Sequence, residues 1–334
     1  MTKLNFAIIG CGRIAKRHAE EISKIGNLAA VCDNKIEYAN ELSTKYNSIA
    51  YNNIDDLLNS KKEVDLISIC TPNYLHAEHT IKALNAGYNV LCEKPMAIKV
   101  KDAEKMMYEA QKTNKRLFIV KQNRFNPPIE ALKKAIEENK LGKIFNVQLN
   151  CFWNRNNKYF EESDWKGRKE LDGGTLYTQF SHFIDLLYWL VGDIVDAKAF
   201  MGNFTHENII EFEDNGSVII RFENGSIGTI NFTVSSYAKN MEGSITIFGE
   251  KGTVKVGGQY LNELEYQSIE DFKIEGLDNS RKANDYGFYQ GSMSNHDLIY
   301  KNVVDVFQNN AQIATNALEG YKVVQIIEKI YKSI

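Results

Sequence analysis

The stretch "FAIIGCGRIAKRHAE" (residues 6–20) runs from an apolar strand pattern, through two glycines, into the pattern of a helix. Gly10 permits a tight turn after the strand, and Gly12 lets a phosphate group approach the backbone closely. The amide groups that open the following helix then supply hydrogen-bond donors and the positive end of the helix dipole. The stretch therefore predicts a strand-turn-helix unit that binds the pyrophosphate of a dinucleotide.

A carboxylate follows where such a unit would bind a ribose. Asp33 ends the next apolar run, about 20 residues after the glycines. Its charge would accept hydrogen bonds from the ribose hydroxyls and repel a 2′-phosphate, so we expect NAD rather than NADP, although Lys35 lies nearby. Ala15 takes the third position of the glycine motif, and the alternative is a glycine turn that binds no ligand. The other loop residues expected to contact the cofactor are Cys11, Arg13 and Ile14.

Composition and charge narrow the kinds of partner that we expect. The chain has 334 residues, of which 43% are hydrophobic and 25% charged, as in a globular protein of two domains. Its 40 basic and 43 acidic side chains are interspersed, so we expect no binding to nucleic acid or to a membrane. No run approaches the ~20 apolar residues of a membrane span, and the chain enters a strand without a signal peptide, so we expect a cytoplasmic protein. The five cysteines form no C-x-x-C pair and are expected to be reduced and mostly buried.

The first third of the chain has the pattern of a doubly wound parallel sheet. Continuous apolar runs, typical of strands covered on both faces, alternate with helical periodicity. The expected strands are Leu4–Gly10, Leu28–Asp33, Val64–Cys70, Tyr88–Cys92 and Arg116–Val120. The expected helices are Ile14–Ile25, Ile36–Tyr46, Leu75–Ala86 and Val100–Thr113.

The rest of the chain has a different pattern. Asn126-Pro127-Pro128 is expected to open a helix, after which period-two runs joined by Asn-Gly turns indicate an antiparallel sheet. The runs are Ser217–Phe222, Ser226–Val234 and Ser244–Phe248, the turns are Asn215-Gly216 and Asn224-Gly225, and the expected helices are Gly174–Leu190, Asn295–Gln308 and Ala317–Ile334. The expected fold is α/β, with an N-terminal Rossmann domain (residues 1–122) and an α+β domain with a large, mostly antiparallel open sheet (residues 123–334).

Three motifs resemble the successive cofactor loops of the Gfo/Idh/MocA oxidoreductases. They are "GCGRIAKRHAE", "CTPNYLHAEHT" and "VLCEKPMAI", in the family's order and spacing, and the resemblance covers the whole chain. It implies that Lys94, in the Glu-Lys-Pro triplet after the fifth strand, is catalytic and contacts cofactor and substrate. It also implies that the cofactor-binding residues include Thr71, Pro72, Asn73, His76, Glu93, Gln122, Trp165 and Arg168.

A second constellation lies in "GGTLYTQFSHFIDLLYWL" (residues 173–190). On one continuous helix, Thr178, Gln179 and Asp185 would share a face with His182. The family resemblance implies that His182 is catalytic and stands beside Lys94 at the nicotinamide. Many members have an aspartate where this chain has Thr178, which shifts proton transfer onto His182 and Lys94.

Two longer stretches are similar to a narrower group, the UDP-N-acetyl-glucosaminuronate 3-dehydrogenases of surface-polysaccharide assembly. They are "DWKGRKELDGGTLYTQFSHFIDLLYWLVGD" and "DYGFYQGSMSNHDLIYKNVVDVF". A uronate carboxylate and a pyrophosphate need cationic donors, and basic side chains precede the His182 helix, although ordinary surface charge is an equal alternative. The expected substrate-binding residues are Lys94, Arg155, Lys158, Thr178, Gln179, His182, Tyr289, Ser292 and Asn295, and Tyr159 and Trp165 are candidates for ring stacking.

The resemblance implies that His182 takes the proton of a sugar C3 hydroxyl while the hydride passes to NAD. It also offers 2-oxoglutarate as a candidate for recycling the cofactor. The open alternatives are another sugar or polyol dehydrogenase of the family and a non-catalytic NAD-binding regulator. We expect no metal, because His76 and His79 have no third ligand nearby in the sequence. We expect a homo-oligomer, a dimer or a tetramer, that covers an open sheet face formed by Ile219, Phe222, Ile230 and Phe232.

Overall fold

The computed structural model describes residues 3–60, 63–278, 283–285, 287 and 289–334. The chain forms two compact units: Met1–Lys121 with His296–Val324, and Gln122–Asn295 with Gln325–Ile334. The sequence-based division placed all of residues 123–334 in one domain. In the structure the segment His296–Val324 belongs with the first unit, where helix α11 (His296–Gln308) packs against helix α1 (Arg13–Ile25).

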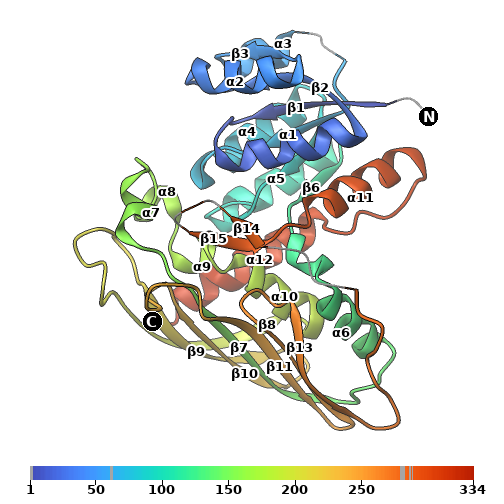
Figure 1. Cartoon of the computed structure of the whole chain (residues 1–334), viewed down its shortest axis with the longest axis vertical. Helices are drawn as coiled ribbons and strands as arrows, with labels where there is room; N and C mark the ends of the chain where they lie inside the picture. The colour runs from blue at the N-terminus through green and yellow to red at the C-terminus, as the bar shows by residue number, and fades with distance from the viewer. Residues whose placement is uncertain (1–2, 61–62, 279–282, 286, 288) are drawn as a thin grey trace. The chain divides into compact units, whose positions relative to one another are not determined.

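The first unit contains a six-stranded sheet in the order β3-β2-β1-β4-β5-β6, in which neighbouring strands pair in parallel (Figure 1). The central strands are almost wholly buried, which explains their unbroken apolar sequences. The strands are β1 (Leu4–Ile9), β2 (Gly26–Cys32), β3 (Ile49–Tyr51), β4 (Leu66–Ile69), β5 (Asn89–Cys92) and β6 (Leu117–Ile119). The predicted parallel sheet is confirmed, although the sequence did not indicate the short strand β3.

The predicted helices that lie wholly in this unit are found within one residue of their expected ends, whereas the helix expected over Ala317–Ile334 ends three residues early. Helix α2 (Ile36–Tyr46) matches its expected range, and the short helix α3 (Ile54–Asn59) was not predicted. The remaining helical elements are η1 (Asn73–Leu75), α4 (His76–Asn85) and α5 (Val100–Lys112). Helix α12 (Ala317–Tyr331) begins in the first unit and ends in the second.

The second unit contains a seven-stranded sheet in the order β13-β12-β11-β7-β10-β9-β8. Its pairings are antiparallel except for β7 with β10. The strands are β7 (Ile144–Phe152), β8 (Ile194–Gly202), β9 (Asn215–Phe222), β10 (Ile227–Thr233), β11 (Glu242–Gly249), β12 (Gly252–Gly257) and β13 (Glu263–Ile269). A separate hairpin pairs β14 (Ala283–Asp285) with β15 (Gln290–Met293). The mostly antiparallel sheet is confirmed.

Helices cover one face of this sheet (Figure 1). The ring of Phe180 packs on Phe232 of β10 and on Trp153, and Phe183 packs on Trp153 as well. The helical elements of the unit are η2 (Gln122–Phe125), α6 (Pro127–Glu137), α7 (Asn157–Glu161), α8 (Lys169–Asp172), α9 (Thr175–Thr178) and α10 (Ser181–Val191). The helix expected at the double proline is therefore confirmed as α6.

The single helix expected over Gly174–Leu190 is wrong. The segment forms two helices, α9 and α10, because the backbone of Phe180 leaves the helical range at φ −112° and ψ 8°. The amide of Phe180 instead bonds back to the carbonyl of Thr175 at 3.3 Å, and its own carbonyl starts α10. Thr178 and Gln179 therefore do not share one regular helix face with His182.

Two expectations about the antiparallel sheet are also wrong. Asn215-Gly216 forms no turn but lies within β9, where the ring of Phe232 fills the place that a side chain of Gly216 would take. Of the four residues expected on the open face, Ile219 is 64% exposed, whereas the other three, Phe222, Ile230 and Phe232, are at most 2% exposed. Side chains alternate along a strand, so these three point to the helix-covered face. The turn at Asn224-Gly225 is confirmed between β9 and β10.

Candidate active site

The glycine turn has the shape that a bound pyrophosphate needs. Gly10 has φ +90°, and a Cβ there would lie 2.7 Å from the carbonyl carbon of Cys70 and the amide nitrogen of Thr71. Gly12 begins α1 with open space around it, and no side chain of the described residues caps this helix start. Amide groups that open a helix without a side-chain cap, beside room for a ligand, suit an anion. The residues present therefore fit the cofactor that the motif predicts.

Asp33 lies at the edge of this turn. Its carboxylate accepts the amide proton of Cys11 at 2.7 Å and that of Lys35 at 2.8 Å, and the side chain is only partly buried. Burial, reinforced by the charge of Asp33, raises the pKa of the Cys11 thiol to about 12. Cys11 is thus a buried thiol, and all five cysteines are free and buried as predicted.

The loops after β4 and β5 are tied together by a histidine. His76 lies within hydrogen-bond distance of the Thr71 carbonyl (2.8 Å) and the Pro95 carbonyl (2.7 Å). The side chain of His79 approaches the Thr71 hydroxyl at 3.2 Å. Of the other residues expected here, Asn73 is buried, whereas Pro72, Arg13 and Ile14 are at least partly exposed.

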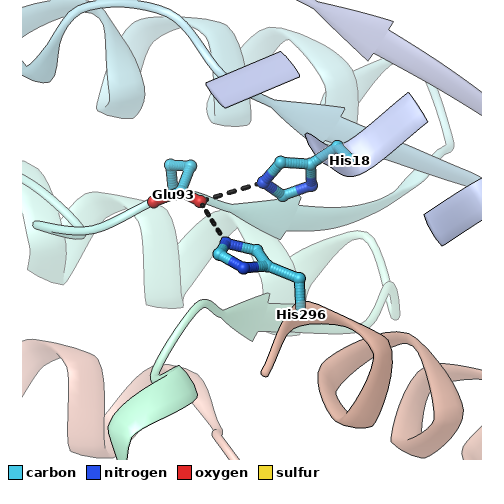
Figure 2. Close-up of side chains that lie close together, drawn as sticks. All are labelled: His18, Glu93 and His296. Carbon is cyan, nitrogen blue, oxygen red and sulfur yellow. Dashed lines mark hydrogen bonds and ion pairs between the residues drawn. The ribbon is translucent and has the colours of Figure 1, made fainter. Parts of the chain in front are cut away.

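Lys94 follows β5 and is partly exposed, and its peptide bond to Pro95 is cis. The backbone amide of Lys94 donates to the carboxylate of Glu93 at 3.0 Å. That carboxylate also contacts two buried histidines, His18 at 2.9 Å and His296 at 3.5 Å (Figure 2). His18 was not among the site residues expected from the sequence. Its position on the buried side of α1 was visible in the sequence, but its partners 75 and 278 positions away were not.

His182 lies in the first turn of α10 and is buried. Three residues further on, Asp185 forms a bidentate ion pair with Arg124 of η2, with two contacts of 2.7 Å. Gln179, which precedes the helix, accepts from Arg155 at 2.6 Å and donates to the Tyr159 hydroxyl at 2.8 Å. The Thr178 hydroxyl also bonds to Tyr159. The segment around His182 is thus held by buried polar contacts that the sequence did not predict.

Arg155 lies among aromatic rings rather than at the surface. Its guanidinium lies 4.9 Å from the ring centre of Trp153, 5.1 Å from Tyr289 and 5.3 Å from Tyr159. Burial, only partly offset by these tyrosines, lowers the pKa of Arg155. Lys166, which the sequence reading did not single out, lies 3.9 Å from the ring centre of Tyr159.

The other residues expected to bind the cofactor or the substrate fall into two groups. Gln122 donates to Ser292 at 2.9 Å, and Asn295 donates to the Gln122 carbonyl at 3.1 Å, so the structure brings these three together. Lys158 is exposed and lies 3.5 Å from Glu162, Arg168 is exposed, and Trp165 is partly exposed.

Among the described residues, one set of His, Cys, Asp and Glu side chains is close enough to hold a metal ion, namely His18, Glu93 and His296. His76 and His79 are not part of it. In the same part of the chain, no helix is long and apolar enough to cross a membrane.

The fold and the site define a dinucleotide-dependent oxidoreductase. Residues 4–121 match the oxidoreductase family with an NAD-binding Rossmann fold, and residues 133–334 match its C-terminal alpha/beta domain. The chain belongs to this family, Gfo/Idh/MocA, and NAD is its cofactor.

Known relatives are similar to the chain along most of its length. The WlbA dehydrogenase from Bordetella pertussis, solved with NADH and UDP-GlcNAcA, is 33% identical with a TM-score of 0.88, over 99% of this chain and 96% of that one. The WlbA dehydrogenase from Chromobacterium violaceum, solved with the same two ligands, is 33% identical with a TM-score of 0.90, over 100% of this chain and 94% of that one. The D-glucoside 3-dehydrogenase of Escherichia coli K12 is 30% identical, over 69% of this chain and 67% of the relative.

Proposed function

We propose that the protein uses NAD to oxidise the C3 hydroxyl of UDP-N-acetyl-glucosaminuronate (UDP-GlcNAcA), in the assembly of a surface polysaccharide such as lipopolysaccharide O-antigen. The observation that carries the proposal is the similarity to the two WlbA dehydrogenases, which extends over both units of the chain. Both relatives were solved with NADH and this nucleotide sugar.

The residues of the first unit bind the cofactor in this proposal. Gly12 and the backbone amides at the start of α1 bind the pyrophosphate, and Asp33 binds the ribose hydroxyls. When bound, NAD supplies the acceptor for the hydride that leaves C3. Thr71 and His76 shape the neighbouring loop.

Lys94 and His182 act on the hydroxyl that is oxidised. His182 accepts the hydroxyl proton, and the carbon–oxygen bond becomes a carbonyl as the hydride departs. The ammonium group of Lys94 stabilises the negative charge that develops on the oxygen. Thr178, where many relatives have an aspartate, bonds to Tyr159 and leaves the role of base to His182.

The anionic parts of the substrate need cations that are accessible. Arg155 is 2% exposed and donates to Gln179. We therefore propose that Arg155 orients Gln179 and Tyr159 and does not bind the substrate directly. Lys158 and Arg168 are exposed and are the better candidates for the pyrophosphate and the carboxylate.

We also propose a homo-oligomer built on the open face of the seven-stranded sheet. On that face Phe200 is 87% exposed, Ile219 64% and Ile227 49%. They lie on the neighbouring strands β8, β9 and β10, and a second copy would cover them. A dimer or tetramer of this kind would work in the cytoplasm, where nucleotide sugars are made, and 2-oxoglutarate would reoxidise the bound cofactor.

A second candidate is the oxidation of a free or simply linked sugar, because the D-glucoside 3-dehydrogenase is 30% identical. Such a substrate lacks a pyrophosphate and a uracil. Binding of UDP alone therefore separates the two candidates, since only an enzyme for nucleotide sugars gains affinity from it. A non-catalytic NAD-binding regulator would bind NAD and oxidise nothing.

The decisive experiment follows NADH absorbance with a panel of UDP-sugars, uronates and free sugars, with and without 2-oxoglutarate. We expect turnover with UDP-GlcNAcA. We expect Lys94→Ala and His182→Ala each to lower kcat by about 10²–10⁴-fold while NAD affinity stays nearly unchanged. Lys101→Ala, an exposed lysine on α5, is the control and should behave like wild type. Turnover of free sugars alone, or normal rates in both variants, would contradict the proposal.

A further inference from the structure

We propose that His18 and His296 are positioning residues that act through the Glu93 carboxylate to hold the backbone of Lys94 in place. The inference rests on the proposed function, because it is there that Lys94 acts on the substrate. It assigns a role to buried groups that the mechanism above does not use.

The two oxygens of the Glu93 carboxylate have different partners. Oε2 accepts the backbone amide of Lys94 at 3.0 Å. Oε1 lies 2.9 Å from Nε2 of His18 and 3.5 Å from Nε2 of His296 (Figure 2). One side of the carboxylate is thus fixed by α1 and α11, and the other side fixes the residue that carries the reactive ammonium group.

A chain of hydrogen bonds on the far side of His18 is compatible with donation from His18 to Glu93. Nδ1 of His18 lies 2.7 Å from the Tyr300 hydroxyl, which lies 2.8 Å from the hydroxyl of Ser68 on β4. If Ser68 donates to Tyr300 and Tyr300 donates to Nδ1, the proton of His18 is on Nε2 and is donated to Glu93. Every group then has a suitable partner, although Ser68, Tyr300 and His18 are all fully buried.

The buried carboxylate depends on these contacts. Burial alone would raise the pKa of Glu93, but its contacts with His18 and His296 outweigh burial and hold the pKa well below its ordinary value. The anion is therefore present at neutral pH. A buried anion held from two helices moves little, so the adjacent amide of Lys94 is held with it.

The same three side chains could in principle bind a metal ion. The 2.9 Å separation between His18 and Glu93 is that of a hydrogen bond with a proton between the two atoms. A shared proton therefore accounts for the contact between His18 and Glu93. His296 lies 3.5 Å from the same oxygen, and neither of its ring nitrogens forms a hydrogen bond among the described residues, so a bound metal is the alternative that the test must detect.

The first test measures hydrogen exchange of the Lys94 amide by NMR, which needs no substrate. Glu93→Ala should speed exchange at Lys94 by at least about tenfold, because its acceptor is lost. Glu93→Gln should retain most of the protection, since its amide oxygen still accepts and His18 can change tautomer. Glu109→Gln, at a buried carboxylate of α5 that pairs with Lys112, is the matched control. Unchanged exchange in Glu93→Ala would overturn the inference.

The second test measures kcat and KM separately, for the wild-type enzyme and for its variants, with the true substrate. Glu93→Ala should lower kcat by about 10²-fold, the scale of a misplaced catalytic group, with little change in NAD affinity, and Glu93→Gln should recover within about tenfold of wild type. Tyr300→Phe, which keeps the ring and removes one contact to His18, should lower kcat several-fold. The Tyr300→Phe effect should disappear in the Glu93→Ala background, because its role passes through Glu93.

The outcomes distinguish the two proposals. A wild-type enzyme that oxidises no nucleotide sugar refutes the proposed function, and the Lys94 exchange rates still decide the positioning role. Equal effects of Tyr300→Phe in both backgrounds would overturn that role. So would one zinc ion per chain in the purified protein that is lost in His296→Asn, because the cluster would then be a metal site.

Discussion

Asp185→Asn should strongly destabilise the second unit, because it leaves the guanidinium of Arg124 buried beside a neutral partner. The pair makes two contacts of 2.7 Å, and its side chains are 3% and 1% exposed. Arg124 also lies 5.1 Å from the ring centre of Trp189, so it cannot turn to solvent without losing that contact. Removing one partner of a buried pair costs about 3–5 kcal/mol, which for a unit of this size lowers the unfolding temperature by roughly 6–20 °C.

The assay is thermal unfolding followed by circular dichroism, with Asp196→Asn on the exposed side of β8 as the control. The double variant Arg124→Met, Asp185→Leu should regain much of the loss, since an apolar pair removes both buried charges. Asp185→Asn should also lower kcat below its unfolding temperature, because His182 lies one turn away on α10. A midpoint within about 2 °C of wild type would refute the reasoning.

Three further outcomes are expected. Asp33→Ala should narrow the preference for NAD over NADP, measured by titration of both cofactors, and equal wild-type affinities would contradict the role of Asp33. Burial raises the pKa of Glu213 to about 7, above its value in the unfolded chain. The contribution of Glu213 to the free energy of unfolding is therefore present at low pH and is lost as the pH rises through about 7. Glu213→Gln keeps an oxygen that accepts from Tyr331 and Thr175. It should raise the unfolding temperature at pH 8 but not at pH 4, and an equal change at both pH values would show that ionisation of Glu213 does not affect stability. Phe200→Glu with Ile219→Glu should reduce the mass found by light scattering, and a wild-type monomer at micromolar concentration would remove the basis for the proposed oligomer.

Local sequence patterns predicted the parts of the structure that local chemistry determines. Gly10 is required because its φ is +90° and the backbone of Cys70 and Thr71, just after β4, leaves no space for a Cβ. This need appears in the sequence as a glycine after an apolar strand. Helix α2 was predicted to the residue, because its apolar positions and its ends are all local signals.

The errors arose where a distant residue overrides a local preference. Asn215-Gly216 has the sequence of a hairpin turn, yet Phe232 on the neighbouring strand needs the space above Gly216 and keeps it in β9. Phe180 sits in a helical pattern, yet packing of its ring against Trp153 and Phe232 accompanies the break between α9 and α10. Arg155 has the sequence context of a surface cation, and only the fold places aromatic rings around it.

The same reasoning applies to the site itself. The motifs predicted Lys94 and His182 as the reactive groups but could not show what holds them. In each unit the nearby element is tied by a buried carboxylate to a segment distant in sequence: Glu93 beside Lys94 reaches His18 and His296, and Asp185, one turn after His182, reaches Arg124. Both carboxylates are nearly inaccessible to solvent, so each is costly to bury and is retained with its charged or hydrogen-bonding partners in place. Oxidation of a hydroxyl removes a hydride from carbon and a proton from oxygen, so the proposed reaction needs Lys94 and His182 to be held in fixed positions, and we propose that this need accounts for the buried charge beside each of them.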